Sequence, residues 1–242
     1  MERIRTAAKL SEAVYRMPEQ KRWLSVNRRV RVCSAEMSQN LIGDNGTIQV
    51  AYEIDKDTLY ISYSGTEDLE NWLYNISYKS VSYYGYHIHE GFLQLALEAL
   101  TALLRGGELH RAIATNGIKS IVHCGHSAGG AVAGIMPIIL GLHEYDTEVI
   151  DFGTPKYLQE HQATFAELPY KRTRFVNNLD VVPKLPLLGR YQHFGEVHDT
   201  TDGSYKNYIQ ALRRFSLLRE VIDQHSMLRY GIAANLKGVS DE

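Results

Sequence analysis

The decisive stretch of sequence reads V-H-C-G-H-S-A-G-G-A and covers residues 122–131. It runs from an apolar segment into Ser127, which has Gly125 two positions before it and Gly129 two positions after it. A strand that turns abruptly into a helix strains the backbone at the turn residue, so its neighbours need to be almost free of side chain. Residues 119–123 suit a buried strand and residues 127–142 suit a buried helix. The stretch therefore predicts a strand-turn-helix that lifts the Ser127 hydroxyl above a sheet, at the positive end of the helix.

The bulk composition fits one α/β domain over residues 1–242. With 242 residues, 44% of them hydrophobic, the chain can bury one substantial core. After residue 90, helical patterns alternate with short β-rich runs, which is typical of a mostly parallel central sheet with helices on both faces. A net charge of −2 gives no reason to expect nucleic acid as a partner.

Hydrophobic periodicity outlines the other elements. The pattern predicts a β-hairpin with strands over 47–53 and 58–63, an amphipathic helix over 91–104, buried strands over 147–152 and 172–177, and helices over 205–218 and 221–230. No repeat, low-complexity tract or linker interrupts them.

The first thirty-odd residues are locally basic and carry an apolar stripe at roughly helical spacing. One interpretation is an N-terminal helix packed on the domain with a solvated basic face, and the other is contact with an anionic lipid surface. Because alanine makes up most of the stripe, the pattern favours the packed helix.

Neither a secretory signal nor a transmembrane segment is expected. Residues 1–10 are charged and lack an apolar core. The longest apolar run, residues 131–142, is too short to span a bilayer and contains Pro137. Cys33 and Cys124 are far apart, and Cys124 lies in the expected buried strand, so we expect two reduced thiols. These features favour a cytoplasmic protein, although export by another route or removal of a signal would leave the same sequence.

The Ser127 hydroxyl needs a base within reach, and that base needs an acid that fixes its tautomer. In folds that use this elbow the partners follow in the order serine, acid, histidine. Asp180 comes after the expected strand 172–177, on the same edge of the sheet as Ser127, whereas Asp199 is expected in a polar loop. Order and placement favour Asp180 as acid and His225 as base. Taken singly, Asp180 also fits an ordinary turn residue, and His225 also fits an ordinary helix-start or surface histidine.

Six short sequence motifs follow one another along residues 47–231. They are Y-S-G-T with N-W-L (63–66 and 71–73), H-E-G-F (89–92), G-H-S-A-G-G-A (125–131), F-G-T-P-K (152–156), N-N-L-D-V-V-P-K-L-P (177–186), and H-S-M with a tyrosine (225–227 and 230). Together they resemble the class 3 (fungal-lipase-like) family of triacylglycerol lipases and feruloyl-type esterases, which has the α/β-hydrolase fold. One such segment is weak evidence, but six in order are hard to explain otherwise.

The resemblance implies roles for individual residues. Ser127 would be the nucleophile, Asp180 the acid and His225 the base. The backbone N–H groups of Thr66 and Ala128 would form the oxyanion hole, with the Thr66 hydroxyl as a third donor.

The chain departs from the family pattern at three positions. The family often has an aspartate a few residues after the tryptophan, where this chain has Asn75, and Ser64 and Lys156 stand where the family has arginine. These departures concern the stability of the oxyanion loop more than the chemistry.

The segment after the oxyanion loop, residues 67–75, resembles the start of the family's lid. Leu69, Trp72 and Leu73 lie on one helical face, and polar residues cover the other. Such a helix could expose its apolar face at a lipid–water interface. The same pattern also fits an ordinary surface helix that packs Trp72 into the core.

The sequence thus predicts a serine carboxylic-ester hydrolase that acts on acylglycerols through an acyl-enzyme. Phospholipid sn-1 esters and short-chain or aryl esters are the alternative substrates, and a catalytically silent interaction protein of the same fold is the alternative from another class. The expected partner is an ester or lipid substrate, at a lipid–water interface in the lipase case.

Neither a cofactor nor a metal ion is expected. The chain has no Walker loop or dinucleotide-binding glycine pattern. His87, His89 and Glu90 could be part of a metal site, as could the histidines that flank Cys124, but neither set completes the ligand spacing of a structural zinc.

Overall fold

The computed structural model describes residues 2–16, 24–25, 30–36, 47–65, 78–141, 143–159, 168–200, 225 and 230. Within these ranges the main sheet has eight strands, in the order β1-β2-β3-β4-β7-β8-β10-β12. The strands are β1 (Leu24–Ser25), β2 (Val30–Glu36), β3 (Thr47–Asp55), β4 (Thr58–Tyr63), β7 (Ser120–His126), β8 (Asp146–Phe152), β10 (Lys171–Val176) and β12 (Glu196–Asp199).

The sheet changes character at β4. From β4 through β7, β8 and β10 to β12 all neighbouring strands are parallel, whereas β1 to β4 pair antiparallel. The carboxyl ends of the five parallel strands therefore meet at one edge. The prediction of an α/β fold with a mostly parallel central sheet is confirmed.

The predicted strands correspond to observed ones. β3 and β4 form the expected hairpin, which pairs Asp55 with Thr58 across a turn whose Lys56 adopts a left-handed φ of 56°. The runs predicted over 147–152 and 172–177 are β8 and β10. The helix predicted over 205–218 lies outside the described residues, and of the one predicted over 221–230 only residues 225 and 230 are described.

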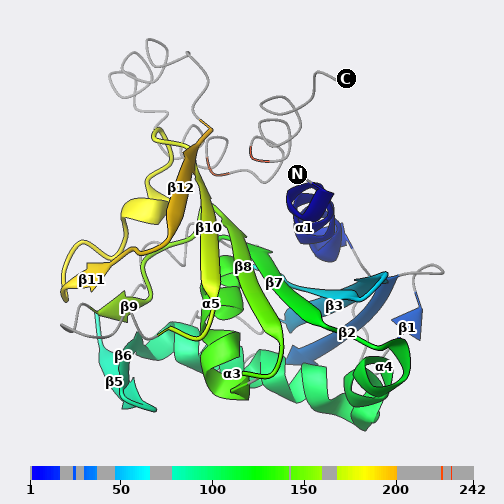
Figure 1. Ribbon diagram of the computed structural model, residues 1–242. Coiled ribbons are helices and arrows are strands. Elements are labelled where there is room, and N and C mark those ends of the chain that lie inside the picture. Colours follow the sequence, from blue (N-terminus) through cyan, green and yellow to red (C-terminus); the bar gives the residue numbers. More distant parts are fainter. Residues whose placement is uncertain are drawn as a thin grey trace, which may run out of the picture.

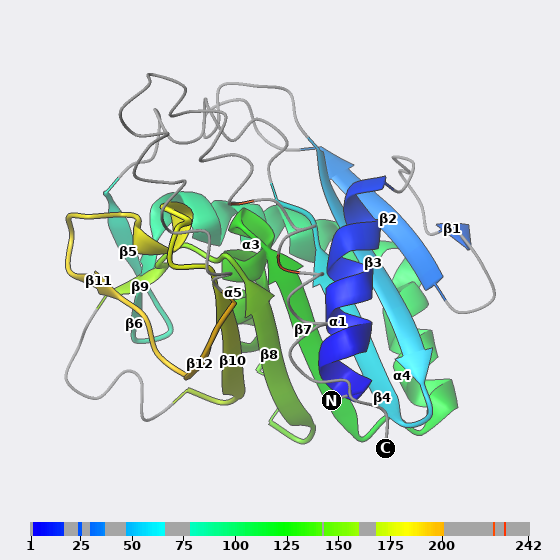
Figure 2. The ribbon, with the colours of Figure 1, turned by 90° about the horizontal axis from the view of Figure 1, so that it is seen from above.

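Two helical layers cover the sheet. In Figure 2, α1 (Glu2–Ala13) crosses the near face, while α3 (Glu90–Leu104), α4 (Glu108–Asn116) and α5 (Ala128–Leu140) lie behind the strands. α1 is followed by the short 3-10 helix η1 (Val14–Arg16), and η2 (Arg105–Gly107) joins α3 to α4. Figure 1 shows the same layers edge-on.

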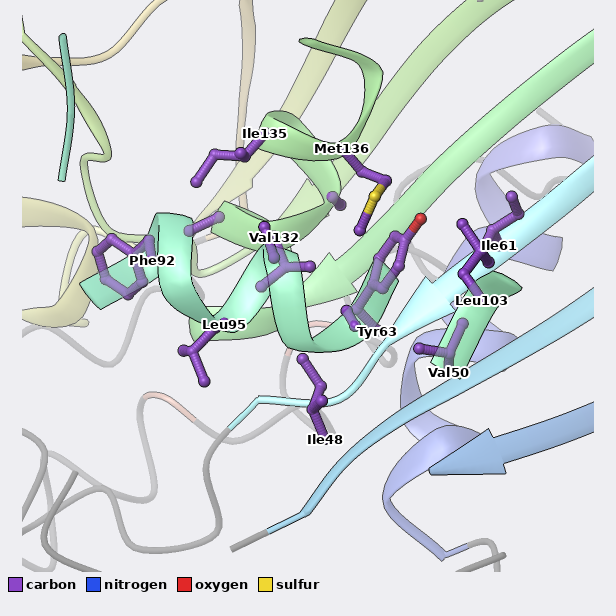
Figure 3. Close-up of a cluster of buried hydrophobic side chains, with 14 of the residues drawn as sticks. Ile48, Val50, Ile61, Tyr63, Phe92, Leu95, Leu103, Val132, Ile135 and Met136 are labelled. Atoms are coloured by element: carbon purple, nitrogen blue, oxygen red, sulfur yellow. The ribbon is translucent and has the colours of Figure 1, made fainter. Parts of the chain in front are cut away.

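The larger core lies between the sheet and the pair α3 and α5 (Figure 3). α3 buries Phe92, Leu95, Ala96, Ala99 and Leu103, the spacing of one face of a helix. Because α5 is composed of small and apolar residues, it is buried throughout positions 128–138. Gly141, with φ 58°, ends it one residue before the predicted end of the helix.

The second core lies under α1, which buries Ala7, Ala8 and Leu10 against the sheet. Arg3 of this helix bonds to Glu148 at 3.3 Å and to the Ser120 hydroxyl at 3.1 Å. These contacts support a packed helix as the role of the basic N-terminal segment.

Cys33 and Cys124 belong to different cores, on opposite faces of the sheet, and neither forms a disulfide. The prediction of two reduced cysteines is therefore confirmed. Across the described ranges, no helix is both long and apolar enough to cross a membrane.

A smaller sheet lies beside the main one. It contains β5 (Ser80–Tyr83), β6 (Tyr86–His89), β9 (Leu158–Gln159) and β11 (Tyr191–Gln192), and Figure 1 shows it at the left. Between β10 and β11 the chain forms the 3-10 helix η3 (Val182–Lys184). This arrangement brings the chain that follows β10 alongside the chain that follows β8, since the Lys156 N–H bonds to the Leu185 carbonyl at 2.7 Å.

Candidate active site

Ser127 occupies the sharp turn between β7 and α5. Its φ of 56° and ψ of −130° are unusual for a residue with a side chain, and its N–H donates to the Phe152 carbonyl of the neighbouring strand at 3.0 Å. A Cβ added at Gly125 would lie 2.4 Å from the Gly129 carbonyl, and one at Gly129 would lie 2.2 Å from the Tyr63 carbonyl. Both positions therefore require glycine, which is the steric reason for the spacing of the motif.

Asp180 lies past the carboxyl end of β10 and is completely buried. Its Oδ2 accepts hydrogen bonds from Nδ1 of His225 at 2.6 Å and from the Tyr230 hydroxyl at 2.7 Å. Its Oδ1 accepts from the Val182 N–H at 2.9 Å. Three donors thus hold the carboxylate in one orientation.

Because its Nδ1 faces a carboxylate, His225 is assigned the tautomer with hydrogen on Nδ1, which leaves Nε2 as the basic nitrogen. Among the described residues neither this Nε2 nor the Ser127 hydroxyl has a hydrogen-bond partner, and both are buried. Catalytic hydrogen bonds of this kind often tighten only when substrate binds. The described residues thus bring together the acid and the base, while the catalytic roles of the three residues stay predictions.

Asp199, the competing acid, lies at the end of β12 instead of in the polar loop expected from the sequence. Its Oδ2 accepts from the Asn178 side chain at 2.7 Å. β12 went unnoticed because it is a largely exposed edge strand without apolar alternation.

Tyr230 contributes more than the sequence indicated. Besides donating to Asp180, its hydroxyl accepts the Asn177 N–H at 3.2 Å. Burial and the charge of Asp180 raise the pKa of Tyr230 well above the ordinary value of 10, so the hydroxyl keeps its proton. A tyrosine five residues after the histidine was the only sequence signal for this role.

His126 and Tyr15 also border the site, and sequence reasoning missed both. Nε2 of His126 lies 2.5 Å from the His225 carbonyl oxygen, and the two rings are 4.5 Å apart between centroids. The Tyr15 hydroxyl lies 3.1 Å from Nδ1 of His126 and 2.9 Å from the Gly65 nitrogen. Burial, and then the neighbouring His225, lower the pKa of His126 well below 6.5.

Of the two expected oxyanion donors, the structure describes Ala128. Ala128 is buried in the first turn of α5, where free N–H groups point toward the elbow. Thr66 lies outside the described residues, but the chain leading to it is held firmly. The Ser64 hydroxyl accepts the Gln49 N–H at 2.9 Å, and the Ser64 N–H donates to the Gln49 carbonyl at 2.9 Å.

Lys156 stands at the second position where the resemblance expects arginine. Its Nζ donates to the Pro186 carbonyl at 3.4 Å. Ser64 and Lys156 therefore both anchor loops at this edge of the sheet despite the departure from arginine. Asn75 and the predicted lid residues Leu69, Trp72 and Leu73 lie outside the described residues.

The residues considered as metal ligands have other partners. Nδ1 of His89 accepts the Phe92 N–H as the N-cap of α3, and Nδ1 of His123 faces the Tyr63 hydroxyl at 2.8 Å. Within the part of the chain that the structure describes, no three His, Cys, Asp or Glu side chains are placed to hold a metal ion.

The parallel sheet has helices on both faces, and Ser127 lies at a strained elbow after β7. Asp180, which is buried and paired with His225, lies past β10. Together these features define an α/β-hydrolase fold. The family described as Lipase (class 3) matches residues 60–189, just over half of the chain, and the protein belongs to this family.

Individual relatives are similar but distant. The lipase of Rhizomucor miehei is 29% identical over 164 residues, which is 61% of this chain and 43% of the relative. The secreted mono- and diacylglycerol lipase 1 of Fusarium solani is 26% identical over 149 residues, 60% of this chain and 44% of the relative. The chain thus spans less than half the length of these curated relatives. A solved structure of the Rhizomucor miehei triacylglyceride lipase has a TM-score of 0.66 at 19% identity and covers 90% of this chain and 92% of that one.

Proposed function

We propose that the protein is a serine carboxylic-ester hydrolase that cleaves acylglycerols. The observation that carries the proposal is the 2.6 Å contact between Asp180 Oδ2 and His225 Nδ1, which leaves Nε2 of His225 as a free base.

The proposed reaction has two halves. Ser127 Oγ forms a bond to the ester carbonyl carbon while its proton passes to Nε2 of His225. The ester C–O bond then breaks, and this proton moves to the departing alcohol. A water molecule attacks the acyl carbon, gives its proton to His225, and Ser127 Oγ leaves with that proton. Asp180 supports the imidazolium in both halves, and the N–H groups of Ala128 and Thr66 stabilise the oxyanion.

Acylglycerols are proposed as substrates because the similar Rhizomucor and Fusarium proteins bear the names of a lipase and a mono- and diacylglycerol lipase. Phospholipid sn-1 esters and short soluble esters remain the alternative substrates. A series of nitrophenyl esters from two to eighteen carbons tests the choice. An optimum at two to four carbons would favour a plain esterase, and one at eight or more would favour a lipase.

A fluorophosphonate probe tests the nucleophile and separates an enzyme from a silent interaction protein. We expect labelling of the wild type, none of Ser127→Ala, and wild-type labelling of Ser82→Ala, which alters an exposed serine on β5. An unlabelled wild type, or equal labelling of Ser127→Ala, would contradict the assignment.

We further propose that the reaction takes place at a lipid–water interface, supported by the apolar face expected for Leu69, Trp72 and Leu73. Hydrolysis of a short-chain triglyceride should then rise steeply once its concentration passes the solubility limit. A smooth hyperbola through that limit would count against a lipase-type lid.

A further inference from the structure

Three separate pieces of the site meet through one tyrosine and one histidine. Tyr15, in η1, contacts the nitrogen of Gly65 and Nδ1 of His126 through its hydroxyl. His126 contacts the carbonyl of His225 through Nε2. Gly65 directly precedes Thr66, and His126 directly precedes Ser127. The contacts therefore link the oxyanion loop, the nucleophile elbow and the base.

The partners assign the hydrogens along these contacts. The His225 carbonyl can only accept, so Nε2 of His126 carries the hydrogen and Nδ1 of the neutral ring is an acceptor. The Gly65 N–H can only donate, so the Tyr15 oxygen accepts it and the hydroxyl hydrogen points to His126, whose Nδ1 at 3.1 Å is nearer than its carbonyl oxygen at 3.3 Å. All donors then point one way, from Gly65 through Tyr15 and His126 to His225. Bonds aligned in this way polarise and strengthen one another.

The loop and the elbow also approach very closely at this point. A Cβ added at Gly65 would lie 2.3 Å from the Tyr15 hydroxyl oxygen and 3.2 Å from the Ser127 Cβ. A side chain at position 65 would have to displace the Tyr15 hydroxyl and press on the His126 carbonyl, so the close approach of the loop to Ser127 goes together with glycine at this position.

We propose that Tyr15 and His126 are positioning residues that hold the oxyanion loop and the base in place around Ser127. The inference rests on the proposed ester hydrolysis and deepens it. His225 is held at two points, its ring by Asp180 and its main chain by His126, so its Nε2 keeps one direction. The neutral His126 adds no second positive charge beside His225 when that ring takes the serine proton. Both residues act through others, Tyr15 through Gly65 and His126, and His126 through the main chain and ring of His225.

The variant Tyr15→Phe tests the proposal, because it removes only the hydroxyl. On a soluble nitrophenyl ester we expect kcat to fall about ten- to a hundredfold with KM within about twofold, as for a misplacement of catalytic groups by a fraction of an ångström. Tyr52→Phe is the matched control. It removes the hydroxyl of a buried tyrosine, which bonds to Glu108 at 3.2 Å far from the site, and should leave kcat unchanged.

A kcat of Tyr15→Phe within twofold of the wild type, or a loss no larger than in the control, would overturn the proposal while leaving the proposed function intact. A wild type that hydrolyses no ester would instead contradict the proposed function, and the positioning role of both residues with it.

Imidazole nitrogen NMR gives a readout independent of activity. With ¹⁵N-labelled histidine, the resonances lost in His126→Asn should report the Nε2-protonated tautomer, and the Nδ1 resonance should shift in Tyr15→Phe. An Nδ1-protonated ring, or a spectrum that Tyr15→Phe leaves unchanged, would overturn the assigned direction of the hydrogen bonds and with it the proposal.

Discussion

The hydroxyl of Tyr230 donates to Oδ2 of Asp180, the same oxygen that accepts from Nδ1 of His225. One carboxylate oxygen therefore bonds both to His225 and to Tyr230, the last residue of the six segments. The orientation of Asp180 therefore depends on Tyr230, fifty residues away. Substitutions at Asp180 and at Tyr230 can separate the contribution of the acid from that of the tyrosine that orients it.

Asp180→Asn should abolish most of the activity while the protein still folds. An amide cannot both orient His225 in the required tautomer and support its positive charge, so we expect kcat to fall about 10³- to 10⁴-fold. Asp199→Asn is the matched control, because Asp199 ends the neighbouring strand β12 and was the competing acid. Full activity of Asp180→Asn together with loss in Asp199→Asn would reverse the assignment.

Tyr230→Phe should lower kcat about tenfold, far less than Asp180→Asn, because two of the three donors to the carboxylate remain. It also removes the hydroxyl that accepts the buried Asn177 N–H, which should lower the unfolding free energy by about 1–3 kcal/mol. Since the pKa of Tyr230 is raised well above 10, the hydroxyl donates throughout the working range, and the kcat ratio should stay constant from about pH 6 to 9. A ratio that changes across this range would contradict the role of a permanent donor.

Gly129→Ala should prevent the elbow from forming. The added Cβ would lie 2.2 Å from the Tyr63 carbonyl and 2.7 Å from the Ser64 carbonyl, and backbone atoms cannot move aside cheaply. We expect a loss of more than about 3 kcal/mol, measured by urea unfolding. Gly117→Ala gives the comparison, because its Cβ meets nothing within 4 Å and only the φ of 59° opposes it, for about 1–2 kcal/mol. Equal losses would mean that contact at the elbow is not the cause.

Stability should decrease as the solution becomes acidic, partly through His123. Burial lowers the pKa of this histidine from 6.5 to about 3, so below pH 6.5 the unfolded chain binds a proton that the folded chain does not. The stabilisation is complete above pH 6.5 and is lost as the pH falls toward 3, about 2 kcal/mol of it by pH 5. In His123→Asn the difference in unfolding free energy between pH 7 and pH 5 should shrink by that amount. His110→Asn, at an exposed position on α4, should leave the difference as in the wild type.

Local signals account for what the sequence predicted well. The elbow is readable because Gly125 and Gly129 flank Ser127 at fixed spacing, and Asp180 is readable because it lies in the motif N-N-L-D-V-V-P-K-L-P just after β10. β12 was missed because an exposed edge strand has no apolar face to mark it. The contact between Tyr15 and His126 joins residues 111 positions apart through one hydroxyl. Such a contact depends on how α1 packs on the sheet, and no periodicity in the sequence reports that.

The pairing of β4 with β7 has a consequence for insertions and deletions. Tyr63 of β4 lies opposite Gly125 of β7 in this parallel pair, so both strands reach the carboxyl edge of the sheet at the same level. A slip of one residue would shift one chain by about 3.3 Å, more than a hydrogen bond can stretch. Indels within these two strands should therefore disrupt the site. The turn at residues 143–145 before β8 lies at the amino edge of the sheet, opposite the edge that carries Ser127. There the chain should accept a few extra residues without any change in ester hydrolysis.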